Sequence, residues 1–143
     1  MAVKITDPLR SDAVNIVRQC LGGTGGITGT NGSAAILKVY AGDFPSTAGA
    51  TSGTQAILVQ INFIGWKAAS NGTALLGTSY PGTAINTGVP NWGRMSDYTG
   101  TGYIIDGVCG TATTCDFKIS SSSMSPTDVI TLTVASIVQP ASE

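Results

Sequence analysis

The chain contains no histidine, and this absence removes the commonest general base, the usual catalytic triads and most transition-metal sites. Charged residues are also scarce: they make up 10% of the 143 residues, against roughly 25% in typical soluble domains. With a formal net charge of −1, the sequence has no basic surface for nucleic acid or anionic lipid. We therefore expect neither nucleic acid nor a membrane as a partner.

The few acidic residues are scattered, which leaves little for carboxylate chemistry. Asp97, Asp106 and Asp116 lie near the ends of predicted strands and could in principle supply a glycosidase pair. An aspartate in such a turn-rich context more often caps a turn by bonding nearby backbone. No segment has the alternating Asp-x-Asp-x-Asn-Gly pattern of a calcium loop. We predict a protein that is not an enzyme and that has no cofactor and no metal.

Three cysteines are an odd number, so no complete disulfide framework can form within one chain. We expect Cys20 to remain a thiol. Cys109 and Cys115 either face each other as thiols at the base of a hairpin or form a disulfide across it. Their spacing is not that of a redox or zinc motif, and a reducing compartment favours the thiols.

Long hydrophobic segments are missing as well. Residues 1–8 lack the apolar core of a signal peptide, and no stretch approaches the roughly 18 apolar residues of a membrane span. The chain is therefore expected to be made in the cytosol and to stay soluble.

One amphipathic helix is predicted at the N-terminus, because Asp7 and Pro8 form a helix start and Gly22-Gly23 a helix stop. This helix either packs on its own domain or docks as an arm on a neighbouring subunit. A Gly/Thr-rich connector follows at residues 24–33, so residues 1–33 are separated from a β domain at 34–143. The residues of the predicted apolar face are Leu9, Ala13, Ile16, Val17, Cys20 and Leu21.

From residue 37 onward the hydrophobic period changes from helical to two, which indicates strands with one buried face. Short turns of Gly, Pro, Ser and Asn separate the runs. We predict an all-β, two-sheet antiparallel sandwich, in particular a jelly roll; an immunoglobulin-like sandwich is the competitor. The predicted strands lie at residues 37–40, 57–63, 73–76, 83–87, 92–97, 103–106, 116–120 and 129–138.

Several strand and turn motifs resemble those of small head proteins of tailed bacteriophages. The similar segments read LKVYAGDFP at 37–45, GTQAIL at 53–58, WGRM at 92–95, IDGVCGT at 105–111, DFKIS at 116–120 and VITLTVASI at 129–137. In arrangement the chain is similar to the jelly-roll decoration, or cement, proteins that clamp an HK97-like shell. The Gly/Thr-rich segment 77–90 is longer than the corresponding connection in that pattern.

That resemblance implies a virion structural protein on the outer capsid surface, made in the host bacterial cytoplasm. Its partner would be the phage major capsid protein, and the chain would form a homo-oligomer, a dimer or a trimer. A decoration protein binds the assembled lattice and stabilises it by linkage. The alternative function is a tail-associated carbohydrate- or receptor-binding module.

Interface candidates follow from the tendency of aromatic and arginine residues to dominate binding hot spots. Core packing is the alternative for the aromatic residues, and an ion pair with Asp97 is the alternative for the arginine. A sugar-binding module would have Trp92 and Tyr98 stacked beside a groove. The candidate interface residues are Trp92, Arg94, Tyr98, Tyr80 and Tyr103.

Overall fold

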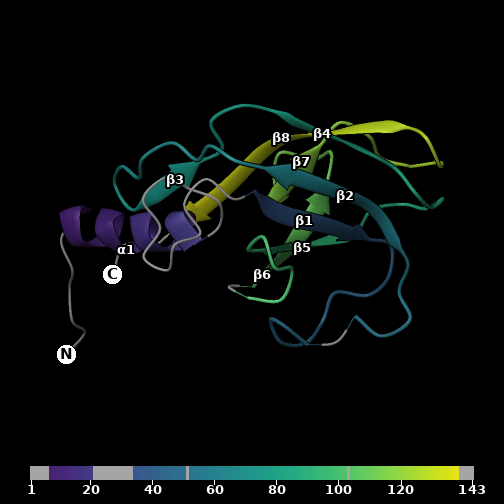
Figure 1. Cartoon of the computed structure of the whole chain (residues 1–143), viewed down its shortest axis with the longest axis horizontal. Helices are drawn as coiled ribbons and strands as arrows, with labels where there is room; N and C mark the ends of the chain where they lie inside the picture. Colours follow the sequence, from purple (N-terminus) through teal and green to yellow (C-terminus); the bar gives the residue numbers. More distant parts are fainter. Residues whose placement is uncertain (1–6, 21–33, 51, 103, 139–143) are drawn as a thin grey trace.

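The computed structural model of the chain describes residues 7–20, 34–50, 52–102 and 104–138. The protein is mostly β, with one short N-terminal helix (Figure 1). No helix in these ranges is long and apolar enough to cross a membrane. In chain order the elements are α1 (Asp7–Cys20), β1 (Ala35–Tyr40), β2 (Ile57–Phe63), β3 (Thr73–Leu75), β4 (Tyr80–Thr83), β5 (Trp92–Ser96), β6 (Ile105–Gly110), β7 (Phe117–Ile119) and β8 (Val129–Val138).

The strands form one mixed sheet that curls into a half-barrel. Its path runs β2-β1-β5-β6-β7-β8-β3, and β4 also pairs with β8, on residues further from the C-terminal end of that strand. All neighbours are antiparallel except β6 and β7, which pair in parallel through Cys109–Phe117 and Gly110–Lys118. The long strand β8 therefore carries β7 on one side and both β3 and β4 on the other.

The curl brings β4 across the sheet toward β2. A bridge joins Val59 to Ala84, and the Ile85 amide donates to the Leu58 carbonyl at 2.8 Å. Gly82 permits this approach, since a Cβ built there would lie 2.6 Å from the Gln60 carbonyl oxygen. One core lies inside the curl; its largest fully buried side chains include Phe63, Phe117, Leu37, Leu58, Ile61, Met95 and Leu132.

The predicted two-sheet antiparallel sandwich, and with it the jelly roll, is not clearly formed. Hydrogen bonding continues from β5 through β6 and β7 into β8, so the strands that would make two separate layers belong to one sheet. The β6–β7 pair is parallel, which an all-antiparallel sandwich excludes. The coarser prediction, a β-rich fold with an N-terminal helix, is confirmed.

The predicted helix is confirmed, but its buried face is only partly right. Of the predicted apolar face, Ala13 is half-buried, but Ile16 and Val17 are 48% and 36% exposed. Val14, which lies outside the predicted face, is 3% exposed. The helix is oriented instead by two polar side chains: the Ala69 amide donates to Asn15 Oδ1 and the Gly72 amide to Ser11 Oγ. These contacts place α1 on β3 and β8 of its own domain. The predicted connector at residues 24–33 lies outside the described residues.

Most of the predicted strands are confirmed, and two are displaced. The strand expected at 83–87 lies at Tyr80–Thr83, where Pro81 and Gly82 weaken the hydrophobic alternation. The strand expected at 103–106 runs instead over Ile105–Gly110 and contains two glycines. Glycine and proline are depleted in strands, so the glycines and the proline of these two segments indicate turns and obscure the true strand bounds.

Candidate functional site

A buried ion pair between adjacent strands fixes a long loop on the sheet. The β5–β6 register places Arg94 opposite Asp106, and Arg94 Nε and Nη2 donate to the two carboxylate oxygens at 2.7 and 2.8 Å. Nη2 also donates to the Ala50 carbonyl, and the Gly49 amide donates to Asp106 Oδ2. The side chains are 12% and 2% exposed. The hydrogen bonds that Arg94 donates to Asp106 raise the pKa of Arg94, so the guanidinium stays charged.

An aromatic cluster lies beside this pair and holds the same loop. The rings of Tyr40 and Trp92 stack with centroids 4.3 Å apart, and Phe44 meets Trp92 edge-on at 6.0 Å. Trp92 Nε1 donates to Gln55 Oε1 at 2.8 Å, and the Arg94 guanidinium lies 5.3 Å from the centroid of the Trp92 ring. The loop between β1 and β2 is thereby attached to β5 at several points.

Two of the five interface candidates therefore make their contacts within the protein itself. Trp92 is 0% exposed and Arg94 is engaged with Asp106, so neither is free to contact a partner. Tyr80 is half-buried and packs against the core next to Phe63. Tyr103 lies outside the described residues.

Tyr98 is the candidate whose exposure fits an interface, at 52%. The stacked Trp92–Tyr98 pair expected of a sugar-binding groove is not formed, because Trp92 is buried and stacks on Tyr40.

The aspartates act mainly as backbone caps. Asp97 Oδ1 accepts from the Thr99 amide, the Thr99 hydroxyl and the Gly102 amide, which closes the loop between β5 and β6. Asp116 Oδ2 accepts from the Val108 amide at 2.9 Å. The alternative considered for Arg94, an ion pair with Asp97, is not formed, because Arg94 pairs with Asp106. Within the described ranges no group of three or more His, Cys, Asp or Glu residues could hold a metal ion.

The Arg94–Asp106 pair was not predicted, although the sequence contains a signal for it. Two predicted strands, at 92–97 and 103–106, are consecutive and joined by a short loop, so they are candidates for a hairpin. Opposite charges near the middle of such strands stabilise one another across the pair.

Cys109 and Cys115 are free cysteines in the structure. The expected hairpin between them is wrong, because the strands they flank, β6 and β7, pair in parallel. Burial, and then the neighbouring Cys115, raises the pKa of the Cys109 thiol to about 12. Cys109 is therefore protonated and unreactive at neutral pH.

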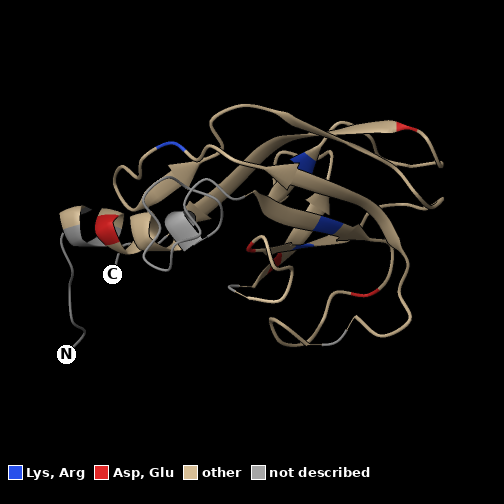
Figure 2. Ribbon diagram, in the orientation of Figure 1, with Lys and Arg blue, Asp and Glu red and all other residues tan. Residues whose placement is uncertain are grey.

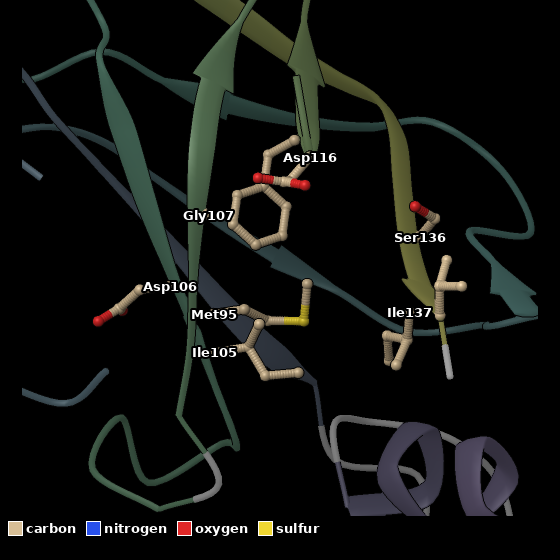
Figure 3. A pocket seen from close by; sticks show the side chains of 9 residues that line it. Met95, Ile105, Asp106, Gly107, Asp116, Ser136 and Ile137 are labelled. Carbon is tan, nitrogen blue, oxygen red and sulfur yellow. The ribbon is translucent and has the colours of Figure 1, made fainter. Parts of the chain in front are cut away.

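Beyond the end of the short strand β7, the sheet has a gap between β6 and β8. A pocket of about 260 Å³ lies there between β6 and the C-terminal part of β8 (Figure 3). Apolar side chains from four strands surround it, while Asp116 and Ser136 lie at its edge. The lining residues are Met95, Ile105, Asp106, Gly107, Asp116, Phe117, Ser136, Ile137 and Val138.

A second, more polar hollow of about 370 Å³ lies over β1 and β5. The β1–β5 register puts Lys38 opposite Arg94, and both line this hollow together with Gly49, Ser52, Gly100, Thr101 and Ile104. Arg94 is neutralised by Asp106, so Lys38 supplies the free positive charge of this hollow.

No protein-family model, curated protein or solved structure matches this chain. The protein is thus classified by its fold alone, as a mostly β protein with one curled mixed sheet and a short N-terminal helix.

Proposed function

We propose that this chain is a virion structural protein, a decoration protein that binds the assembled major capsid protein lattice of a tailed bacteriophage. The partner is the phage major capsid protein, and the site of action is the outer capsid surface. The strand and turn motifs at 37–45, 53–58 and 129–137 support this proposal through their resemblance to such proteins. The single curled sheet departs from the jelly roll of that family, so the proposal depends on surface chemistry more than on fold.

The observation that carries the proposal is an exposed aliphatic strand surface. Val129, Val134 and Val138 of β8 are 68%, 43% and 55% exposed, and Leu75 of the adjacent β3 is 45% exposed. Charged residues are few among the described residues, and Arg94 and Asp106 neutralise each other inside the protein (Figure 2). A protein that binds over a wide, uncharged area gains affinity from apolar contact, and this contact is insensitive to salt.

The contacts that attach the loop between β1 and β2 to the sheet support the same role. A protein that stabilises a shell does so through its binding free energy. Ordering a mobile segment on binding reduces that free energy, so a segment that is ordered beforehand favours binding. The Arg94–Asp106 pair and the Trp92 cluster order this loop before any partner binds. A surface prepared in this way loses little entropy when it docks.

The test uses capsids that lack the protein. Such particles should assemble but lose DNA or shape at lower temperature than complete ones, and added purified protein should bind back and restore them. Val129→Asp with Val134→Asp should abolish this rebinding. The exposed loop substitution Ser122→Asp is the matched control and should leave it intact.

Quantitative mass spectrometry of intact particles separates the proposal from its alternative. Hundreds of copies per particle would support a shell protein. A few copies or a dozen would instead indicate a tail-associated carbohydrate- or receptor-binding module. Deleted particles as stable as complete ones, with no stoichiometric copies in the wild type, would rule out decoration.

A further inference from the structure

The sheet contains a strand-shaped gap in line with β7. β7 pairs with β6 only at Cys109 and Gly110, and with β8 only up to Ala135. Beyond that point, in the part of the chain that the structure describes, no strand pairs with residues 105–108 of β6 on the side away from β5. Residues 136–138 of β8 likewise pair with β3 on one side alone. The pocket of Figure 3 lies between these two edges.

The backbone of β6 faces this gap with hydrogen-bonding groups. The Cys109 amide donates toward β5, to the Asn91 carbonyl, whereas the Val108 amide donates the other way, to Asp116. Successive residues of a strand alternate in direction, so the amide and carbonyl of Asp106 point into the gap. A strand edge of this kind is a template for another strand.

The width of the gap suits one strand. At its upper end β7 lies between β6 and β8 and holds them two strand spacings apart, roughly 9.6 Å. The floor is apolar, with Met95, Ile105 and Ile137 directed into it. At the edge lies Asp116, which forms no ion pair with any described residue. An occupant therefore needs an extended backbone, aliphatic side chains on one face and, at best, a positive charge.

We propose that residues 2–6 of a second copy of this chain fill the gap as an added strand. This segment reads Ala-Val-Lys-Ile-Thr, in which Val3 and Ile5 share one face and Lys4 lies on the other. Val, Ile and Thr favour strands, and α1 begins only at Asp7. The two aliphatic side chains enter the apolar pocket, and Lys4 adds the charge that complements Asp116.

Geometry favours a second copy over the same chain. Helix α1 has 14 residues, a length of about 21 Å, and Figure 1 shows its N-terminal end directed away from the sheet. Five extended residues span at most about 17 Å. A segment that had to run back along its own helix would have no residues left to lie in the gap. Reciprocal exchange between two copies closes both gaps.

Sedimentation equilibrium of the full chain tests this proposal. We expect concentration-dependent self-association, weakened at least about tenfold by the double substitution Val3→Ser and Ile5→Ser, because two aliphatic side chains lose their burial. The matched control, Ala2→Ser with Thr6→Ser, changes only the opposite face and should associate like wild type. Circular dichroism should show all three proteins equally folded.

The receiving side is tested separately with a synthetic peptide of residues 1–8. The Val3→Ser, Ile5→Ser protein has an unoccupied gap and should bind this peptide. Adding Ile105→Lys should abolish binding, whereas Val129→Lys, an exposed change at the other end of β8, should preserve it. A chain that stays monomeric, or that associates equally well with both serine pairs, contradicts strand exchange. The proposal deepens the homo-oligomer of the proposed function, but this experiment contains no capsid, so the two can fail independently.

Discussion

Asp106 takes part both in the pairing of β5 with β6 and in the attachment of the loop between β1 and β2. Its carboxylate accepts two hydrogen bonds from Arg94 and one from the Gly49 amide, while its own strand pairs with β5. With a side chain only 2% exposed, it depends on these donors for the solvation that water would otherwise supply. Gly49 and Ala50 of the loop between β1 and β2 are therefore attached to the sheet through this charge pair.

Removing the cation alone should be costly. Arg94→Met leaves the Asp106 carboxylate buried without its partner, and we expect the free energy of unfolding to fall by about 3 kcal/mol. Urea denaturation measures this loss. Hydrogen exchange of the Gly49 amide should accelerate more than that of the Ser120 amide, which donates to the Thr131 carbonyl far from this loop.

The double variant Arg94→Met, Asp106→Leu is the control for that experiment. It removes both charges, so it should recover much of the stability lost by the single change. Equal losses in the single and double variants would show that packing of the arginine stem, not the charge pair, holds the loop.

Because of Cys109, the free energy of unfolding should depend on pH in the alkaline range. Its pKa is raised from 9.0 to about 12, mainly by burial, so the folded state keeps the proton over a range in which the unfolded state releases it. The resulting contribution is complete below pH 9 and is lost as the pH rises toward 12. Between these limits the free energy of unfolding should fall by about 1.4 kcal/mol per pH unit from this group.

Denaturation of Cys109→Ala and Cys115→Ser at a series of pH values tests this dependence. The alanine variant should lose this part of the slope, whereas the serine variant should keep most of it, since Cys115 is the smaller cause of the shift. In a Cys20→Ser background, iodoacetamide at pH 8 should modify the half-buried Cys115 before Cys109. Faster modification of Cys109 would contradict the raised pKa.

At the scale of elements, α1 is attached to the sheet by a small contact. Among the side chains of α1 that the structure describes, Val14 is buried, and Ser11 and Asn15 accept hydrogen bonds from amides of the segment that leads into β3. Val14→Ala should lower the free energy of unfolding by about 1–2 kcal/mol, or release the helix without unfolding the sheet. Val17→Ala, on the exposed side, should change it by less than about 0.5 kcal/mol.

Hydrogen exchange of the Gly72 amide distinguishes these two results for α1. Local release accelerates exchange of this amide while the amides of β1 and β5 remain protected. Global destabilisation accelerates all of them together. An unchanged Gly72 amide in the Val14→Ala variant would show that the helix is held elsewhere.

Element positions followed from the sequence where period-two alternation was long. The runs at 57–63 and 129–138 were located because β-branched and aliphatic residues alternate there over several residues. The orientation of short segments was not predictable in the same way. Trp92 stands among Pro, Gly and Asn in the sequence, and residues far away in the chain, among them Tyr40 and Gln55, cover it in the fold.

At the scale of the whole molecule, the curvature of the sheet determines whether the strands form one layer or two, and the sequence pattern does not predict this curvature. The alternation of β1, β2, β5 and β8 specifies buried faces, but two layers and one curled layer bury such faces equally well. The choice depends on close backbone approaches and on the short β6–β7 pair, neither of which leaves a periodic signal. The gap below β7 also depends on strand pairing between distant segments, so no periodic pattern in the sequence predicts it.

Gly82 is the position at which this curvature can be tested. A Cβ there would meet the Gln60 carbonyl oxygen at 2.6 Å and an Ile61 side-chain carbon at 2.7 Å, so Gly82→Ala must push β4 away from β2. We expect a loss of about 1–3 kcal/mol, together with faster hydrogen exchange of the Ile85 amide that donates to Leu58.

Thr83→Val, an exposed change on the same strand, is the matched control for Gly82→Ala. It should leave both the stability and the exchange of the Ile85 amide near wild type, because its side chain points away from β2. If Gly82→Ala were equally harmless, the contact between β4 and β2 would not hold the curl. The half-barrel would then be maintained by the continuous hydrogen bonding through β6, β7 and β8 alone.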